Sequence, residues 1–119
     1  MDRNLYLQDV RVIAQIVAKW SVYALPLTED VLEITVDISQ WGETPLVTAR
    51  TEDGGEVILF DTTEASRANE AHLEDCRHVE ASWGDWQDVP GFFSLFCDAL
   101  TAELTAKGLP VPLYIRRDA

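Results

Sequence analysis

The stretch VLEITVDISQWGETPLVTARTEDGGEVILF, residues 31–60, decides the fold. Its first nine residues alternate between apolar and polar side chains, which is typical of a strand with one buried face. Glu33 and Asp37 fall on the other face, which would meet solvent. The residues predicted on the buried face are Leu32, Ile34, Val36 and Ile38.

The remainder of this stretch predicts two further strands. Asp53-Gly54-Gly55 separates them, and glycine supplies the positive φ that a tight hairpin turn requires. Residues 31–60 are therefore predicted to form a three-stranded antiparallel meander.

Two apolar helices are predicted, one before and one after the meander in the sequence. From Leu5 to Ala24 the apolar residues recur at steps of three and four, with Asn4 or Asp2 as the cap and Pro26 beyond the end. The second helix is predicted to start at Asp88 as cap with Pro90 in its first turn, and to end at Gly108. The apolar stripes are Leu5, Val12, Ile13, Ile16, Val17 and Trp20 in the first helix, and Phe93, Phe96, Leu100 and Leu104 in the second.

A third, polar helix is predicted for residues 62–77, with Thr62 or Thr63 as its cap. Leu73 is its only large apolar residue, so we expect it to bury little and to lie on the surface. The carboxylates that it would display to solvent are Glu64, Glu70, Glu74 and Asp75.

The predicted architecture is α+β: a small antiparallel sheet of three or four strands, two apolar helices on one face, and a polar surface helix. The tail VPLYIRR would add an edge strand that leaves Arg116 and Arg117 exposed. The 119 residues suffice for a single domain, residues 1–119. No apolar run reaches the roughly 18 residues of a membrane span, and MDRNLYLQDV lacks the layout of a secretion signal. We expect a cytoplasmic protein that contacts no membrane.

Charge is concentrated in the middle of the chain. The net charge is −12, and residues 28–88 hold 16 acidic residues against three arginines, which is −13. Such a field repels nucleic acid and attracts basic proteins. Solubility alone accounts for many acidic surfaces, but it does not require this segregation, which raises self-repulsion in the folded state.

Residues 70–91, EAHLEDCRHVEASWGDWQDVPG, combine histidine, cysteine, carboxylates and tryptophan. His72, Cys76 and His78 are possible zinc ligands, but with Cys97 they are too few and too scattered for a structural site, so we expect no metal and no cofactor. The cysteines are expected to be free thiols. Cys76 is also a poor nucleophile, because its acidic neighbours disfavour the thiolate. No catalytic motif is present, and we expect a protein that is not an enzyme.

The tryptophans in and near this run have two interpretations. Trp41, Trp83 and Trp86 either close the edges of a small core or serve as exposed anchors of an interface, ringed by acids and suited to a partner rich in arginine. On the second interpretation the partner-binding residues are Glu64, Glu70, Glu74, Asp75, Glu80, Trp83, Asp85, Trp86 and Asp88.

The resulting hypothesis is an acidic inhibitor that occupies a basic site on a partner protein, of the kind that holds nucleic-acid phosphates. Phage-encoded inhibitors of bacterial defence, such as anti-CRISPR proteins, offer an analogy in mode of action, without a shared motif. An immunity protein that neutralises a basic toxin would use the same physics. A house-keeping domain that is acidic for solubility is the third possibility. The oligomeric state is left open.

Overall fold

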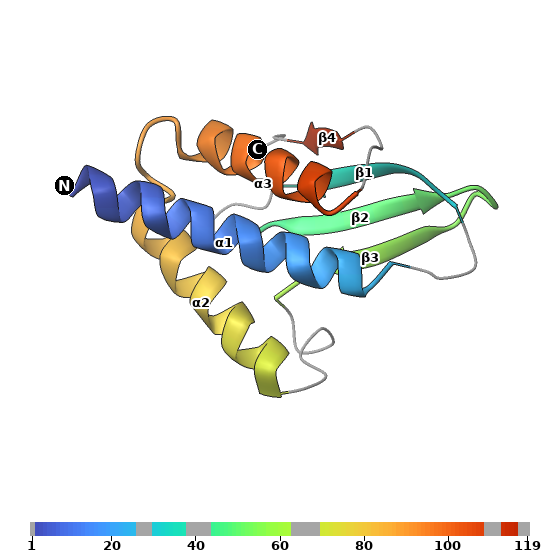
Figure 1. The fold of residues 1–119 in the computed structure, drawn as a ribbon, viewed down its shortest axis with the longest axis horizontal. Coiled ribbons are helices and arrows are strands. Elements are labelled where there is room, and N and C mark those ends of the chain that lie inside the picture. Colours follow the sequence, from blue (N-terminus) through green and yellow to red (C-terminus); the bar gives the residue numbers. More distant parts are fainter. Residues whose placement is uncertain (1, 26–29, 38–43, 63–69, 109–112, 117–119) are drawn as a thin grey trace.

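The computed structural model describes residues 2–25, 30–37, 44–62, 70–108 and 113–116. The helices in these ranges are α1 (Arg3–Tyr23), α2 (Glu70–Trp86) and α3 (Phe92–Ala106). The strands are β1 (Val31–Asp37), β2 (Leu46–Thr51), β3 (Glu56–Phe60) and β4 (Leu113–Arg116). They form one sheet in the order β3-β2-β1-β4 (Figure 1), which confirms the predicted α+β class.

The meander has the predicted antiparallel pairing, β1 with β2 and β2 with β3. The predicted edge strand is also present, but β4 runs parallel to β1, so the sheet is mixed. Short loops produce antiparallel neighbours, whereas β4 returns to the sheet after two helices and can therefore run in either direction.

Strand β1 confirms the predicted alternation with one exception. Ile34 and Val36 are buried, but Leu32 is 41% exposed. The pairing of β1 with β2 shifts register between Val31 and Glu33, so Leu32 is an extra residue that the bulge turns out of the core. Ile38 lies outside the described residues.

The predicted hairpin turn lies between β2 and β3. Gly54 has a φ of 87°, a conformation that side-chain-bearing residues adopt only under strain. The turn is closed by backbone bonds, in which the Thr51 N–H donates to the Gly55 carbonyl at 2.9 Å and the Gly54 N–H donates to the Thr51 carbonyl at 3.0 Å. The side chain of Asp53 accepts the Gly55 N–H at 2.9 Å.

Helix α1 begins where one of the two predicted caps stands. The Asp2 carboxylate accepts the backbone N–H groups of Asn4 and Leu5, at 3.0 and 3.1 Å. Leu5 was predicted on the buried stripe, but it is 47% exposed because it lies about 100° around the helix axis from the buried Tyr6. The buried side of α1 starts instead at Tyr6 and continues through Val10.

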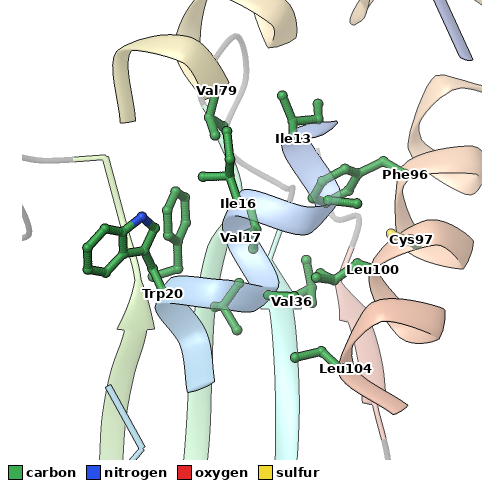
Figure 2. Packing of buried hydrophobic residues seen from close by; sticks show 14 of the residues in the cluster. Ile13, Ile16, Val17, Trp20, Val36, Val79, Phe96, Cys97, Leu100 and Leu104 are labelled. Atoms are coloured by element: carbon green, nitrogen blue, oxygen red, sulfur yellow. The ribbon is translucent and has the colours of Figure 1, made fainter. Parts of the chain in front are cut away.

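Helix α1 lies beside α3 along the strands, and the two helices cover one face of the sheet (Figure 1). Buried side chains of α1, α2, α3 and β1 meet in one continuous core (Figure 2). Burial of these apolar groups is the main stabilising contribution. The residues of this core that Figure 2 labels are Ile13, Ile16, Val17, Trp20, Val36, Val79, Phe96, Cys97, Leu100 and Leu104.

Helix α3 starts later than its predicted cap. Asp88 and Pro90 lie in a turn between α2 and α3, and the N-cap residue is Gly91, with a φ of 84° and no side-chain capping bond. This correction follows from the length of α2, which ends only at Trp86 and leaves five residues for the connection. Phe92 takes the buried place predicted for Phe93, which is half-buried. None of the helices described here is long and apolar enough to cross a membrane.

Candidate functional site

Helix α2 contains most of the predicted partner-binding residues, but it differs from the predicted weak helix of residues 62–77. It spans Glu70–Trp86 and buries Cys76, Val79, Ser82 and Trp83 on one side. Residues 63–69, with the predicted contact Glu64, lie outside the described part. The buried apolar residues of α2 are part of the core, so α2 is held in place by packing. The expectation that this helix buries little is therefore wrong.

Trp83 is the main anchor of α2 and is not available to a partner. Its side chain is 1% exposed. Its ring lies 4.8 Å from that of Phe92 and 5.0 Å from that of Phe96, both in edge-on geometry, and 5.7 Å from that of Phe93. Edge-on aromatic pairs add to the stabilisation from burial. The prediction that Trp83 contacts a partner is therefore wrong, and its alternative, a place in the core, is confirmed.

Trp86 is half-buried at the end of α2. Its indole N–H donates to the Asp9 carboxylate of α1 at 2.8 Å, and its ring lies 5.2 Å from that of Tyr6. These contacts fix α2 to the first half of α1. Trp41, the third tryptophan considered, lies outside the described residues.

Asp75 belongs to the contact between α2 and α1 and does not face open solvent. One carboxylate oxygen accepts the Trp20 indole N–H at 2.7 Å and pairs with the Lys19 ammonium at 3.1 Å. The Asp75 side chain is 27% exposed. The predicted display of this carboxylate to a partner is corrected accordingly, since its hydrogen bonds are directed at α1.

The remaining carboxylates lie on the solvent side of α2 and in the turn after it. At 100° per residue, Glu70, Glu74 and Asp85 fall within about 60° of one another around the helix axis. Arg77 is exposed on the same side, about 20° around the axis from Glu70, and His78 is exposed at its edge. The other exposed residues between the charges are small, Ala81 and Gly84 among them. We call this surface the acidic α2 face, and its residues are Glu70, Glu74, Glu80, Asp85 and Asp88, all exposed.

An aromatic cluster that the sequence did not reveal lies at the start of α2. The His72 ring stacks on that of Trp20, with centroids 4.3 Å apart and planes 19° apart, and Tyr23 meets Trp20 edge-on at 5.4 Å. Burial lowers the pKa of His72 below its ordinary value of 6.5. The negative charge of Asp75 partly offsets this effect, and the positive charge of Lys19 adds to it.

This shift in pKa makes stability depend on pH. The unfolded chain binds a proton at His72 more readily than the folded chain, so the stabilisation is complete above pH 6.5 and is lost as the pH falls towards the lower pKa of the folded state. His72→Phe keeps a ring on Trp20 without a titrating group. Between about pH 7 and pH 5, the free energy of unfolding of the wild type should fall more steeply than that of this variant. Parallel curves from urea denaturation would contradict the prediction.

The possible metal ligands do not converge. Cys76 and Cys97 form no disulfide, and both are buried, as small apolar residues often are. No group of three or more His, Cys, Asp or Glu residues in the described ranges could hold a metal ion. Absence of zinc from the purified protein stays a prediction.

No protein-family model, no curated protein and no solved structure matches this chain. The function must therefore be argued from the chemistry of the surface that the fold presents.

Proposed function

We propose that the protein binds a basic site on a partner protein through the acidic α2 face. The observation that supports this most is the division of α2 into two sides. Trp83 fixes the inner side in the core, while the five carboxylates of the acidic α2 face stay exposed. A rigid helix holds charges at fixed spacing, so binding loses little conformational entropy.

The geometry suits arginine and lysine side chains. Carboxylates form short, charge-assisted hydrogen bonds with guanidinium and ammonium groups. Between them, Gly84 has open space around the position of a Cβ, so a partner's surface can come close to the helix. The net charge of −12 adds long-range attraction, which raises the rate of association.

Inhibition by occlusion is the mode of action that follows from this chemistry. Carboxylates placed against arginine and lysine compete with phosphates for the same donors. A partner that holds DNA or RNA would then lose its nucleic acid when this protein binds. The protein itself is not expected to bind nucleic acid, because its field repels phosphate.

The test compares two triple variants that change the net charge by the same amount. One carries Glu70→Lys, Glu74→Lys and Asp85→Lys. The control carries three reversals at exposed acids outside α2 and outside the strands, which are Asp30→Lys, Glu52→Lys and Asp98→Lys. Wild type and both variants serve as baits in affinity purification from the cells that encode the protein, and each retained partner is then purified for binding measurements.

The α2 variant should lose at least about tenfold in affinity, mainly through slower association, while the control keeps most of it. Wild-type binding should weaken as salt rises, because exposed charges are screened beyond about 8–10 Å. Displacement of the partner's nucleic acid would support occlusion, and retention of a basic toxin would identify an immunity protein instead. Equal binding by all three baits would show that the charge serves solubility, and the proposal would be wrong.

A further inference from the structure

The face of the sheet opposite the helices carries one row of side chains across all four strands. Ile58, Thr48, Thr35 and Tyr114 are Cα partners along β3, β2, β1 and β4. Partners in register share a face, and these residues alternate with the buried ones. The residues at the two ends of the row are the apolar ones, and Ile58 is 56% and Tyr114 53% exposed. We call the surface around this row the open sheet face.

A second row on the open sheet face is charged. Glu56, Arg50 and Glu33 are partners along β3, β2 and β1. The Arg50 Nε donates to the Glu33 carboxylate at 2.8 Å. Charges of both signs therefore stand side by side on the two central strands.

We propose that two copies of this chain pair through the open sheet face as a two-fold dimer. The two-fold axis would be parallel to the strands. It would lie between β1 and β2, halfway between the two facing sheets. This rotation exchanges β1 with β2 and β3 with β4. Ile58 of each copy then lies over Tyr114 of the other, Thr48 lies over Thr35, and Arg50 lies over Glu33. Facing sheets pack about 10 Å apart, which these side chains can fill.

The charge pattern selects this axis over the other in-plane choice. A two-fold axis perpendicular to the strands, through the row of Thr35 and Thr48, would place Glu33 over Asp37 of the second copy. Like charges would then face each other at the centre of the interface. The axis along the strands instead pairs a cation with a carboxylate twice. Like any two-fold interface, it closes upon itself without forming fibres.

A second copy also fits this surface better than the basic partner does. The strong like charge of the chain opposes self-association at the acidic α2 face, but on the open sheet face Arg50 offsets Glu33. Helix α2 packs on α1 and projects away from the sheet (Figure 1), so the acidic α2 faces of the two copies would lie outside the dimer interface. If the proposed function holds, the dimer presents two acidic surfaces and can gain affinity by binding two basic sites at once.

The test uses the full chain in sedimentation velocity, with concentrations up to about 1 mM. The wild type should shift from monomer to dimer as its concentration rises. Ile58→Lys should raise the dimer dissociation constant at least about tenfold, because it removes the apolar contact with Tyr114. Leu5→Lys is the matched control, since Leu5 is an exposed apolar residue on α1, and this variant should dimerise like the wild type.

A mixing experiment tests the axis itself. Arg50→Glu places carboxylates at both central positions, and Glu33→Arg places guanidinium groups there. Each variant alone should be monomeric, but an equal mixture should form a heterodimer in which every cation faces a carboxylate. This readout requires only that each variant folds, which circular dichroism checks.

Three outcomes would overturn the dimer. They are a wild type that stays monomeric at every concentration, a dimer that Ile58→Lys leaves intact, and a mixture of the charge variants that stays monomeric. None of the substituted residues belongs to the acidic α2 face, so failure of the dimer would leave the proposed function standing.

Discussion

Replacing Trp83 with alanine should lower the free energy of unfolding by about 3–5 kcal/mol, a large part of the stability of a small domain. The indole is almost fully buried against Phe92 and Phe96, and these rings cannot close the cavity that its loss would leave. Urea denaturation followed by far-ultraviolet circular dichroism measures the change without depending on tryptophan fluorescence.

Trp86→Ala is the matched control for this measurement. Trp86 stands three residues further along the same helix and is half-buried, so its loss removes less contact area. Trp83→Ala should therefore be clearly the more destabilising of the two variants. A loss below about 1 kcal/mol for Trp83→Ala would mean that the ring is not a core residue. The interpretation of Trp83 as an interface anchor would then have to be restored.

Replacing Asp75 with alanine is expected to cost about 1–3 kcal/mol. The variant leaves the buried Trp20 indole N–H without its acceptor. An unsatisfied buried donor lowers stability by its full cost of desolvation. The free energy of unfolding from urea titration is again the measured quantity.

Two variants separate the hydrogen bond from the ion pair at Asp75. Asp75→Asn keeps an oxygen acceptor for Trp20, and Lys19→Met removes only the cation, whose side chain is 57% exposed. Both should lose less than about 1 kcal/mol, because exposed ion pairs contribute little. If Lys19→Met proves as costly as Asp75→Ala, the ion pair and not the indole bond holds α2 at this point.

Local sequence signals predicted the elements that depend on neighbours in the chain. The Asp2 cap, the alternation of Ile34 and Val36, and the turn at Gly54 each follow from a pattern of a few residues. No local pattern predicts the parallel pairing of β4. Its direction depends on where α2 and α3 end in space before the chain returns to β1.

Helix α2 shows how one residue can hide a regular pattern. Cys76, Val79, Trp83 and Trp86 have helical spacing, yet Gly84 indicates a loop when it is weighed alone. Gly84 is in fact exposed near the end of the helix, where the cost of a glycine is small compared with burial of Trp83. The predicted helix ended at residue 77, and with Gly84 taken as part of a loop the two tryptophans were not assigned to a buried helix side.

The sequence predicted which charged residues of the candidate site are exposed, but it did not predict the hydrogen bonds between its helices. Exposed acids such as Glu70 and Glu74 follow from composition, since isolated carboxylates are rarely buried. The bonds from Trp20 to Asp75 and from Trp86 to Asp9 join positions far apart in the chain. They are set by how α1 crosses α2, which no local pattern specifies.

The packing of α1 against α3 has a consequence for synthesis on the ribosome. Ile13 of α1 lies with Phe96 of α3 in the core (Figure 2). Helix α1 is therefore synthesised well before α3, the helix that covers part of its apolar side. During that interval the nascent chain exposes the surface of α1 on which Val10 and Val17 lie, and long-range contacts of this kind also slow folding. A chaperone that binds apolar segments would therefore find its target in residues 3–23 until residues 92–106 have emerged.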